Sequence, residues 1–453
     1  MDISNKNVLV IGLGISGVST IKALNRLGAI IWVTDTKQEE DVKDVLKALN
    51  GIPINKVLGV NDMDLSQIDL IVKSPGVPPY VPIIEKAINE GIEVITDIEF
   101  GYRLNLTDNF IAITGTNGKT TTTTLVGEVF KAANYNTHVV GNIGKGILGE
   151  LIDSKSEDIF IIEASSFQLE HTRYFKPKVS LILNLAPDHI DWHGSYENYI
   201  TSKKKIFNNQ DIDDFIVLNY DDPLLRTFKD EMKSNLIWFS INEKLDKGIY
   251  IDGEYIFIND GNKNIKFMPI KEIKILGRHN LENVLACIGI CISMGIDLGT
   301  LRNTIKSFNG VEHRLEFVVE KDGIKFYNDS KGTNPEASIK AISAIPAPII
   351  LIAGGYDKQS DFDEFISSFK GKVKAMILLG QTKYKLKESA DNNNFSSYYL
   401  VETLDEAVNL AYKLGIEGDN ILLSPACASW GMFNNFEERG KLFKEAVYRL
   451  GDD

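Results

Sequence analysis

The segment from residue 110 to residue 133 most constrains what this chain can fold into. An apolar run, Phe110–Ile113, leads into Thr114-Gly115-Thr116-Asn117-Gly118-Lys119-Thr120-Thr121, and a helix-like segment follows through Ala133. A strand, a glycine loop and a helix hold a nucleotide triphosphate, because loop N–H groups and the helix N-terminus face the phosphates. Lys119 supplies a positive charge, and the Thr120 hydroxyl suits Mg²⁺. The spacing differs from the common G-x-x-x-x-G-K-[ST] loop. The alternative, a glycine turn with an incidental lysine, leaves the agreement of strand, loop and helix unexplained.

Composition narrows the class of protein. The 453 residues predict two to four domains, and 43% apolar with 25% charged residues is typical of a globular protein. A net charge of −13 argues against nucleic acid or an anionic membrane as the main partner. Three cysteines, Cys287, Cys291 and Cys427, fit a reducing cytoplasm. We expect a cytoplasmic protein without a signal peptide or membrane insertion, because the longest apolar stretch, Val284–Ile296, is shorter than the roughly 20 residues that span a bilayer.

Apolar strand candidates alternate with helical patterns in three α/β blocks, which begin near Val8, Asn109 and Val311. The candidates include Leu70–Lys73, Glu93–Ile95 and Val179–Leu183. A strand-rich, turn-rich portion from Ile237 to Phe267 interrupts the second block. The alternation predicts parallel sheets with ligands at the carboxyl ends of the strands. We expect three domains, with bounds 1–96, 97–310 and 311–453.

The first block carries Gly12-x-Gly14-x-x-Gly17 directly after a strand, and Asp35 ends the next strand. Taken alone, this pattern is the dinucleotide fingerprint and favours a nicotinamide-dependent oxidoreductase. A tight strand-to-helix turn without a ligand is the alternative. Ser74-Pro75-Gly76-Val77 follows another strand, so a second loop is expected at the same crevice.

The second block adds candidate metal ligands. Glu163 follows the apolar strand Ile159–Ile162 and is placed to hold Mg²⁺, although a surface carboxylate is the alternative. The run Asp188-His189-Ile190-Asp191-Trp192-His193 fits either a transition-metal cluster or an outer Mg²⁺ site with one histidine ligand, and a structural role is favoured for His193.

The second block also contains a lysine run and a pair of asparagines, and each allows two interpretations. Lys203-Lys204-Lys205 lies on a predicted helix, Tyr196–Phe207, where a lysine run indicates a solvated face. Asn280 and Asn283 begin the next helix with amides that suit a nucleobase edge, and helix capping is the alternative for Asn280.

Polar loops follow several strands of the third block. They are Glu312-His313-Arg314, Asn328-Asp329-Ser330-Lys331-Gly332-Thr333-Asn334-Pro335, Gly354-Gly355-Tyr356-Asp357-Lys358 and Ser424-Pro425-Ala426-Cys427-Ala428-Ser429-Trp430. Polar loops at separate strand ends predict a binding mouth.

Together these motifs resemble the Mur ligase family of peptidoglycan synthesis over essentially the whole chain. Thr-Gly-Thr-Asn-Gly-Lys-Thr, Glu-Ala-Ser-Ser-Phe-Gln-Leu-Glu, Asp-His-x-Asp, Gly-x-His-Asn-x-x-Asn, Glu-His-Arg and Asn-Asp-Ser-Lys-x-Thr-Asn occur in family order. The ending Ser-Pro-Ala-Cys-Ala-Ser, followed by Asn-Phe-Glu-x-Arg-Gly, resembles the members that add D-glutamate. The Asp-Asn-Pro-Arg motif of the diaminopimelate- or lysine-adding relatives does not occur. Gly431 and Gly332 depart from common family variants.

The resemblance implies a Rossmann-like first domain, a P-loop-type central ATPase domain with a mixed sheet, and a Rossmann-like third domain. It implies ATP-driven addition of D-glutamate to UDP-N-acetylmuramoyl-L-alanine through an acyl phosphate, with two Mg²⁺ sites and a monomeric chain. A family member that adds another amino acid and, in a different class, the nicotinamide oxidoreductase are the alternatives.

The resemblance also implies site residues. The residues implied to bind the UDP-substrate are Gly14, Ile15, Ser16, Asp35, Thr36, Ser74, Pro75 and Gly76. Those implied to bind ATP are Gly115, Thr116, Asn117, Gly118, Lys119, Thr120, Thr121, Asn142, Asn283, His313, Arg314 and Asp329. Those implied to bind D-glutamate are Thr333, Lys358, Ser429 and Phe436. The metal ligands are Thr120, Glu163, His189 and Lys203, and the catalytic residues are Lys119, Glu163, His189, Lys203, Arg314 and Lys331.

The resemblance replaces the solvated-face interpretation for one lysine. Lys203, four residues after Tyr199, matches the family lysine that reacts with CO₂ to give a carbamate. A carbamate is a carboxylate on a long arm and supplies the hard oxygens that Mg²⁺ prefers.

Overall fold

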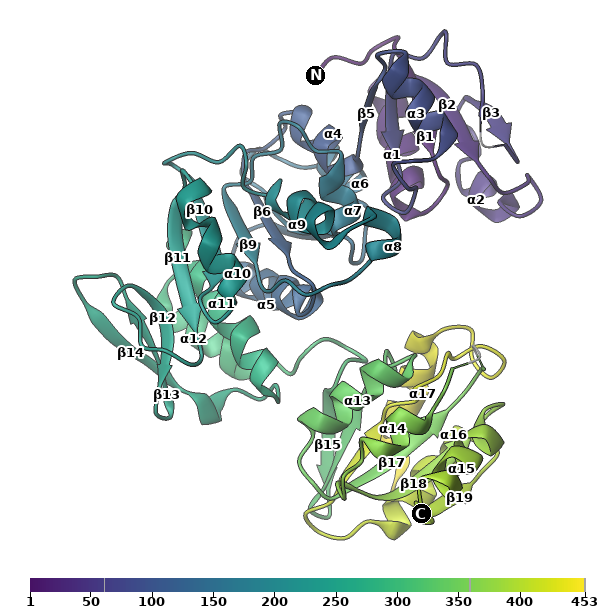
Figure 1. The fold of residues 1–453 in the computed structure, drawn as a ribbon, viewed down its shortest axis with the longest axis vertical. Coiled ribbons are helices and arrows are strands. Elements are labelled where there is room, and N and C mark those ends of the chain that lie inside the picture. Colours follow the sequence, from purple (N-terminus) through teal and green to yellow (C-terminus); the bar gives the residue numbers. More distant parts are fainter. Residues whose placement is uncertain (61, 358–359, 452–453) are drawn as a thin grey trace. The chain divides into compact units, whose positions relative to one another are not determined.

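The structure is a computed structural model that describes residues 1–60, 62–357 and 360–451. The chain divides into two compact units, residues 1–270 with 282–305 and residues 271–281 with 306–453. The first unit contains two β-sheets and the second unit contains one (Figure 1). The three-block α/β prediction is therefore confirmed at the level of the sheets.

The first sheet has five parallel strands in the order β3-β2-β1-β4-β5. Its strands are β1 (Asn7–Ile11), β2 (Ile30–Asp35), β3 (Ile54–Leu58), β4 (Leu70–Lys73) and β5 (Glu93–Ile95), and its helices are α1 (Ile15–Arg26), α2 (Lys43–Ala48) and α3 (Pro82–Asn89). The strand order changes direction between β1 and β4. Because ligands of open parallel sheets bind outside the strand ends at such a switch point, the loops after β1 and β4 form the expected crevice.

The second sheet has nine strands in the order β14-β13-β12-β11-β10-β9-β6-β8-β7. Strands β6 to β12 pair in parallel where they are neighbours, whereas β12, β13 and β14 form an antiparallel meander. The strands are β6 (Phe110–Thr114), β7 (Thr137–Gly141), β8 (Ile159–Glu163), β9 (Val179–Ile182), β10 (Phe215–Asn219), β11 (Asn235–Ser240), β12 (Gly248–Asp252), β13 (Tyr255–Asn259) and β14 (Asn264–Pro269). The mixed central sheet implied by the resemblance is confirmed.

Helices precede, connect and follow the strands of this sheet. They are α4 (Asp97–Arg103), α5 (Lys119–Ala132), α6 (Ile147–Leu151), α7 (Ser166–Glu170), α8 (Ile190–His193), α9 (Tyr196–Lys204), α10 (Pro223–Arg226), η1 (Thr227–Glu231), η2 (Ile270–Glu272), α11 (Arg278–Ser293) and α12 (Leu298–Ser307). One apolar cluster joins β1 and β2 to β6 and β8 through α1, α4 and α6, so burial of apolar surface holds the first two sheets together.

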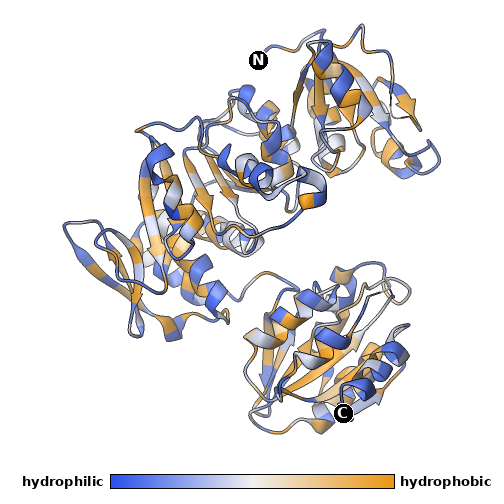
Figure 2. Cartoon of the chain, in the orientation of Figure 1, coloured by the Kyte–Doolittle hydropathy of each residue, from blue (hydrophilic) through white to orange (hydrophobic). Residues whose placement is uncertain are grey.

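The third sheet has six strands in the order β15-β16-β20-β17-β18-β19, and every neighbouring pair is parallel except β15 with β16. The elements are β15 (Glu316–Lys321), β16 (Ile324–Asn328), α13 (Pro335–Ala344), β17 (Ile349–Gly354), α14 (Asp363–Ser367), β18 (Val373–Leu379), α15 (Lys383–Asn392), β19 (Tyr398–Leu400), α16 (Leu404–Leu414), β20 (Asn420–Leu423) and α17 (Phe436–Arg449). Apolar clusters cover both faces of this sheet, and Figure 2 shows its apolar strands between helices of mixed polarity. Burial on both faces explains why these strands read as continuous apolar runs.

The structure adds one observation on membranes. In the part of the chain that it describes, no helix combines the length and the apolar character needed to cross a bilayer.

Candidate active site

The phosphate loop has the predicted local structure. Strand β6 ends at Thr114, the loop turns through two glycines at positive φ, Gly115 (149°) and Gly118 (85°), and α5 begins at Lys119. A Cβ on Gly118 would lie 2.3 Å from the Asn283 Oδ1 atom, which brings the predicted adenosine ligand Asn283 against the loop. Lys119 Nζ donates hydrogen bonds of 2.9 Å to the Gly115 and Thr116 carbonyls. The helix N-terminus and this ammonium therefore create a site for phosphate oxygens.

The end of β9 supports the loop through a residue that the sequence analysis missed. Asn184 Oδ1 accepts a hydrogen bond of 2.9 Å from the Asn117 N–H, and the Asn184 carbonyl accepts one of 3.0 Å from the Thr116 N–H. Asn184 directly follows the apolar strand candidate Val179–Leu183, and a polar residue at a strand end was the signal that could have found it.

Glu163 lies at the end of β8, beside β6, and its side chain is buried. Its Oε1 atom accepts a hydrogen bond of 2.9 Å from Asn142 Nδ2, whereas its Oε2 atom has no hydrogen-bond partner among the described residues. A buried carboxylate oxygen without a partner is costly, and a bound cation satisfies it. Glu163 therefore fits a magnesium ligand, and the surface-carboxylate alternative is wrong.

Lys203 is buried, although it lies in a run of three lysines on α9. Its side chain is 1% exposed, and Nζ donates hydrogen bonds of 3.1 Å to Thr114 Oγ1 and 2.9 Å to the Gly115 carbonyl. Burial, and then the charge of Lys119, hold the pKa of Lys203 well below its usual range, although Asp188 and Glu163 act in the opposite direction. An amine with a lowered pKa keeps its lone pair and remains nucleophilic. The solvated-face alternative is wrong for this lysine.

The other two lysines of the run point elsewhere. Lys204 pairs with Glu231, and Lys205 pairs with Glu170. Tyr199 shares the environment of Lys203, because its ring centroid lies 4.8 Å from Lys203 Nζ and its hydroxyl lies 2.9 Å from Thr116 Oγ1. Of the three lysines, Lys203 is therefore the one that faces the phosphate loop.

The two histidines after β9 differ in environment. His189 has a half-exposed side chain, adopts a left-handed conformation (φ 51°) before α8 and lies 3.5 Å from the Asp188 carboxylate. His193 is buried, and its Nε2 and Nδ1 atoms lie 2.9 Å from Ser166 Oγ and 3.3 Å from Ser202 Oγ. Burial lowers the pKa of His193 to about 4. His193 is thus a structural side chain, whereas His189 remains accessible to a ligand.

These residues also bear on the kind of metal. In the described ranges, no three His, Cys, Asp or Glu side chains gather as a metal-binding group, and the transition-metal alternative gains no support. The hydroxyl of Thr120 at the start of α5 and the unpartnered Glu163 oxygen are hard oxygen donors of the kind that Mg²⁺ prefers.

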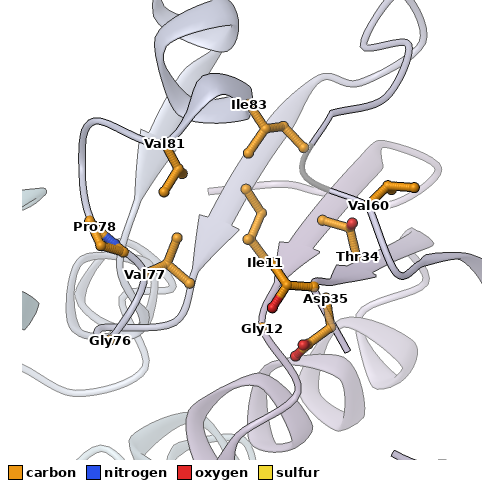
Figure 3. A pocket seen from close by; sticks show the side chains of 11 residues that line it. Ile11, Gly12, Thr34, Asp35, Val60, Gly76, Val77, Pro78, Val81 and Ile83 are labelled. Atoms are coloured by element: carbon orange, nitrogen blue, oxygen red, sulfur yellow. The ribbon is translucent and has the colours of Figure 1, made fainter. Parts of the chain in front are cut away.

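A cavity of about 220 Å³ lies at the switch point of the first sheet. In Figure 3, Val77, Pro78 and Val81 line one side and Thr34, Asp35 and Val60 the other, with Ile11 between them. Of the predicted UDP-substrate residues, Asp35, Thr36 and Gly76 line this cavity. The mostly apolar lining with a few polar groups is typical of a site for a ring-bearing ligand.

Hydrogen bonds join the loops around this cavity. The Asp35 carboxylate accepts bonds from the Leu13 N–H (2.8 Å) and the Lys37 N–H (2.9 Å), and Ser74 Oγ donates to the Gly12 carbonyl (3.0 Å). Pro75 lies beside Ser74 in the same loop. Asp35 and Ser74 therefore fix the shape of the crevice.

The three glycines after β1 have different roles. A Cβ on Gly17 would lie 1.9 Å from the Gly12 carbonyl oxygen, so Gly17 is required by packing. Gly14 begins α1 at φ −76°, and a Cβ there would meet no atom within 4 Å. Ile15 is 71% exposed beside it, and Ser16 follows. The fold thus does not require glycine at position 14, and the space beside it is open to the predicted UDP-substrate.

In the second unit, residues just before β15 and at the end of β16 form a buried polar centre. His313 adopts a left-handed conformation (φ 64°), and its Nδ1 atom accepts a hydrogen bond of 3.0 Å from Asn328 Nδ2. Asp329 accepts hydrogen bonds from Ser424 Oγ (2.7 Å) and the Leu315 N–H (3.2 Å), and burial raises the pKa of Asp329 to about 7. The structure thus brings His313, Arg314 and Asp329 to one end of this sheet.

Arg439, which was not predicted as a site residue, ties the neighbouring loops together. It is 2% exposed and donates hydrogen bonds to Ser330 Oγ (3.0 Å), the Ser330 carbonyl (2.7 Å) and the Cys427 carbonyl (3.1 Å). Lys331 Nζ lies 5.6 Å from the centroid of the Phe436 ring. Lys331, Phe436 and the buried Ser429 therefore belong to one group of loops, and Thr333 follows in the loop before α13. Lys358 lies outside the described residues.

Comparisons with known proteins agree with this arrangement. Three family models match the chain: "Mur ligase MurD-like, N-terminal domain" over residues 6–96, "Mur ligase middle domain" over 113–291 and "Mur ligase, glutamate ligase domain" over 313–427. The chain therefore belongs to the Mur ligase family.

Curated relatives extend the likeness over the full length. The UDP-N-acetylmuramoylalanine--D-glutamate ligase of Alkaliphilus oremlandii is 49% identical, with 99% of this chain and 100% of the relative covered. The ligases of the same name from Thermoanaerobacter sp. and Clostridioides difficile are 47% and 45% identical, again covering 99% of this chain and 100% of each relative.

Solved structures show the same fold. The UDP-N-acetylmuramate-alanine ligase of Thermotoga maritima has a TM-score of 0.59 at 20% identity, covering 98% of this chain and 99% of that chain. The MurF ligase of the same organism, solved in complex with ADP, has a TM-score of 0.58 at 17% identity and covers 99% of both chains. At these identities the likeness shows the fold alone.

Proposed function

We propose that this chain is an ATP-dependent ligase that joins D-glutamate to UDP-N-acetylmuramoyl-L-alanine in peptidoglycan precursor synthesis. The observation that carries the proposal is 49% identity over 99% of the chain to a relative of that name. The presence of two separate strand–glycine–helix loops in the first unit supports it, because the reaction needs two nucleotide sites. Domain bounds of 1–96, 97–310 and 311–453, a monomeric chain and a cytoplasmic location remain predictions.

The reaction joins a carboxylate to an amine, and ATP supplies the activation. A carboxylate oxygen of the L-alanyl group attacks the γ-phosphorus, the bond to the bridging β,γ-oxygen breaks, and ADP leaves. The D-glutamate amine then attacks the carbonyl carbon of the acyl phosphate, inorganic phosphate leaves, and the amine gives up a proton. The residues of the site must therefore stabilise phosphoryl charge in the transition state.

The contacts of Lys119 support a role on the phosphates. Its ammonium already rests on loop carbonyls at the helix N-terminus, so little reorganisation is needed when phosphate oxygens replace them. The predicted roles of Arg314 and Lys331 in charge stabilisation, of Asn142, Asn283, His313 and Asp329 near adenosine, and of Thr333, Lys358, Ser429 and Phe436 near D-glutamate rest on the resemblance.

The environment of Lys203 supports carbamate formation. Its Nζ lone pair would attack the carbon of CO₂ to form an N–C bond, and one N–H proton would leave to water, which gives a carbamate anion. A lowered pKa favours this step, because a protonated ammonium has no lone pair. We propose that Thr120 and Glu163 hold one Mg²⁺ ion and that His189 and the Lys203 carbamate hold a second, and bound Mg²⁺ would neutralise phosphate charge.

The site gives little support to the alternative function, a nicotinamide-dependent oxidoreductase. It explains the glycine loop after β1 but gives no role to Lys119, to the unpartnered Glu163 oxygen or to buried Lys203.

Phosphate release from ATP tests the proposed function. We expect turnover only when UDP-N-acetylmuramoyl-L-alanine and D-glutamate are both present, and incubation with NAD(H) should give no absorbance change. Equal turnover with L-glutamate, or full turnover without the UDP-sugar, would contradict the proposal.

A further inference from the structure

Lys73 is a buried charge that no step above uses. It is the last residue of β4, is 1% exposed and directly precedes the loop Ser74-Pro75-Gly76-Val77. Burying an ammonium is expensive unless hydrogen bonds and opposite charges compensate it. A lysine at this position therefore needs a physical reason.

Among the described residues, the ammonium of Lys73 makes one hydrogen bond, and that bond indicates the reason. Lys73 Nζ donates a hydrogen bond to the Val77 carbonyl at 2.7 Å, so the side chain links the two ends of the 74–77 loop. Gly76, Val77 and Pro78, which this bond restrains, all line the cavity in Figure 3. The start of the loop is fixed separately, by Ser74 Oγ to the Gly12 carbonyl (3.0 Å) and by the Ser74 N–H to the Ile11 carbonyl (2.7 Å).

Groups from the second sheet surround the ammonium. The carboxylates of Glu170 and Asp97 favour its charged form, but burial dominates and lowers the pKa of Lys73 to about 8. Nζ also lies 5.3 Å from the centroid of the Trp192 ring on α8, the helix that follows His189. Lys73 thus lies between the cavity loop and the helix that directly follows His189, a proposed metal ligand.

Several buried polar atoms in the surroundings of Lys73 lack hydrogen bonds. Asp97 Oδ2, His171 Nε2 and Trp192 Nε1 are buried and have no hydrogen-bond partner among the described residues. Each such atom costs stability, and apolar residues of similar size avoid that cost. Stability alone therefore does not account for the buried lysine.

We propose that Lys73 is a positioning residue, which holds the 74–77 loop in the shape that receives the UDP-bearing substrate. It acts through the Val77 carbonyl and does not touch the reacting atoms. The inference rests on the proposed function, since that function assigns the UDP-substrate to this cavity.

Substitution by methionine tests the proposal, because Lys73→Met keeps the length of the side chain and removes the donor. We expect the Kd for UDP-N-acetylmuramoyl-L-alanine, measured by calorimetry, to rise by about tenfold or more, the loss expected for one charged hydrogen bond. The KM for ATP should change by less than about twofold. Lys86→Met is the control, because Lys86 also donates to a backbone carbonyl, that of Met63 at 2.7 Å, and neither residue lines the cavity.

A double variant separates positioning from charge balance. Lys73→Met removes the cation near Asp97, a carboxyl whose pKa is raised by burial, and the double variant Lys73→Met, Asp97→Asn also removes that carboxyl. If Lys73 positions the loop, the double variant should recover stability but keep the raised Kd.

Three results would overturn the proposal: normal substrate Kd in a folded Lys73→Met variant, recovery of Kd in the double variant, or failure of both variants to fold. Absence of binding to the wild-type protein would instead refute the proposed function, so the two failures are distinguishable.

Discussion

The first unit contains two strand–glycine–helix loops that look alike in sequence and differ in chemistry. The loop after β1 leads into α1 at Gly14, where a Cβ meets no neighbour, and the first turn of α1 has no cation. The loop after β6 leads into α5 at a left-handed Gly118, and two lysines, Lys119 and Lys203, converge on the Gly115 carbonyl. Glycines alone therefore indicate a close approach of backbone and ligand, and the surrounding charges decide which ligand approaches.

The polarity and charge of the surroundings also differ between the two loops. The cavity near the first loop is lined mainly by apolar side chains, which suits a base or ribose. The second loop has a buried carboxylate oxygen without a partner and a buried amine with a lowered pKa. A triphosphate with Mg²⁺ needs this second kind of environment.

The largest expected effect comes from Lys203→Ala. Turnover should fall by more than about 10³-fold, because the proposed carbamate would be lost with the metal-ligand atoms that it supplies, which exceeds the loss from one preorganised group. Added short carboxylic acids should restore part of the activity by occupying the vacated position. Lys204→Ala is the control and should change turnover by less than about fivefold, since its partner Glu231 is half-exposed. A ¹³C signal from labelled CO₂ on Lys203 would sharpen the result, and full activity of unmodified Lys203 would contradict it.

Lys119→Ala should reduce turnover by about 10²–10³-fold, the usual cost of removing one preorganised charged donor. The variant should fold, because Lys119 is only half-buried and donates to loop carbonyls. Steady-state phosphate release, with circular dichroism to verify folding, measures the effect. Near-normal turnover in a folded variant would place the triphosphate elsewhere.

The two glycines at the helix starts should respond differently to alanine. Gly118→Ala introduces a Cβ at φ +85° and 2.3 Å from Asn283 Oδ1, and we expect a loss of about 1–2 kcal/mol in the free energy of unfolding. Gly14→Ala, at φ −76° with open space, should change that free energy by less than about 0.5 kcal/mol. Urea denaturation of both variants compares them directly, and equal losses would show that the two loops are not built differently.

A smaller effect than that of Gly118→Ala is expected from Tyr199→Phe. The variant loses the hydroxyl contact of 2.9 Å with Thr116 Oγ1, and we expect a cost of about 0.5–1.5 kcal/mol in stability with a modest rise in the KM for ATP. Tyr196→Phe is a suitable control, because its ring stacks on Tyr199 and the ring remains. A larger effect from Tyr196→Phe than from Tyr199→Phe would contradict the role of the hydroxyl contact.

Much of the fold could be predicted from sequence because its central strands are short apolar runs that end at glycine or polar residues. The structure confirms β4 (Leu70–Lys73) and β5 (Glu93–Ile95) at the predicted bounds, and β8 (Ile159–Glu163) differs by one residue. Strand β3 (Ile54–Leu58) was missed, because it lies at the edge of its sheet and carries exposed Asn55 and Lys56.

Buried charged side chains were harder to predict than the loops that they support. From the residues alone, Lys203 belonged to a solvated face, and only the packing of α9 against the end of β6 buries it while Lys204 remains paired near the surface. The burial of Lys73 and Arg439 was equally hard to predict, because both side chains bond to carbonyl groups of loops whose positions in space do not follow from the sequence. The sequence pattern located the loops, and tertiary contacts determined which cations serve them.

Calorimetry of two variants with two ligands tests the central claim that the two loops bind different nucleotides. Gly14→Val and Lys119→Ala would each be titrated with UDP-N-acetylmuramoyl-L-alanine and with a non-hydrolysable ATP analogue. We expect Gly14→Val to weaken binding of the UDP-sugar by at least about tenfold and to leave the ATP analogue unaffected, and Lys119→Ala to do the reverse. Loss of ATP-analogue affinity in Gly14→Val, with intact affinity for the UDP-sugar, would contradict the assignment of the two loops.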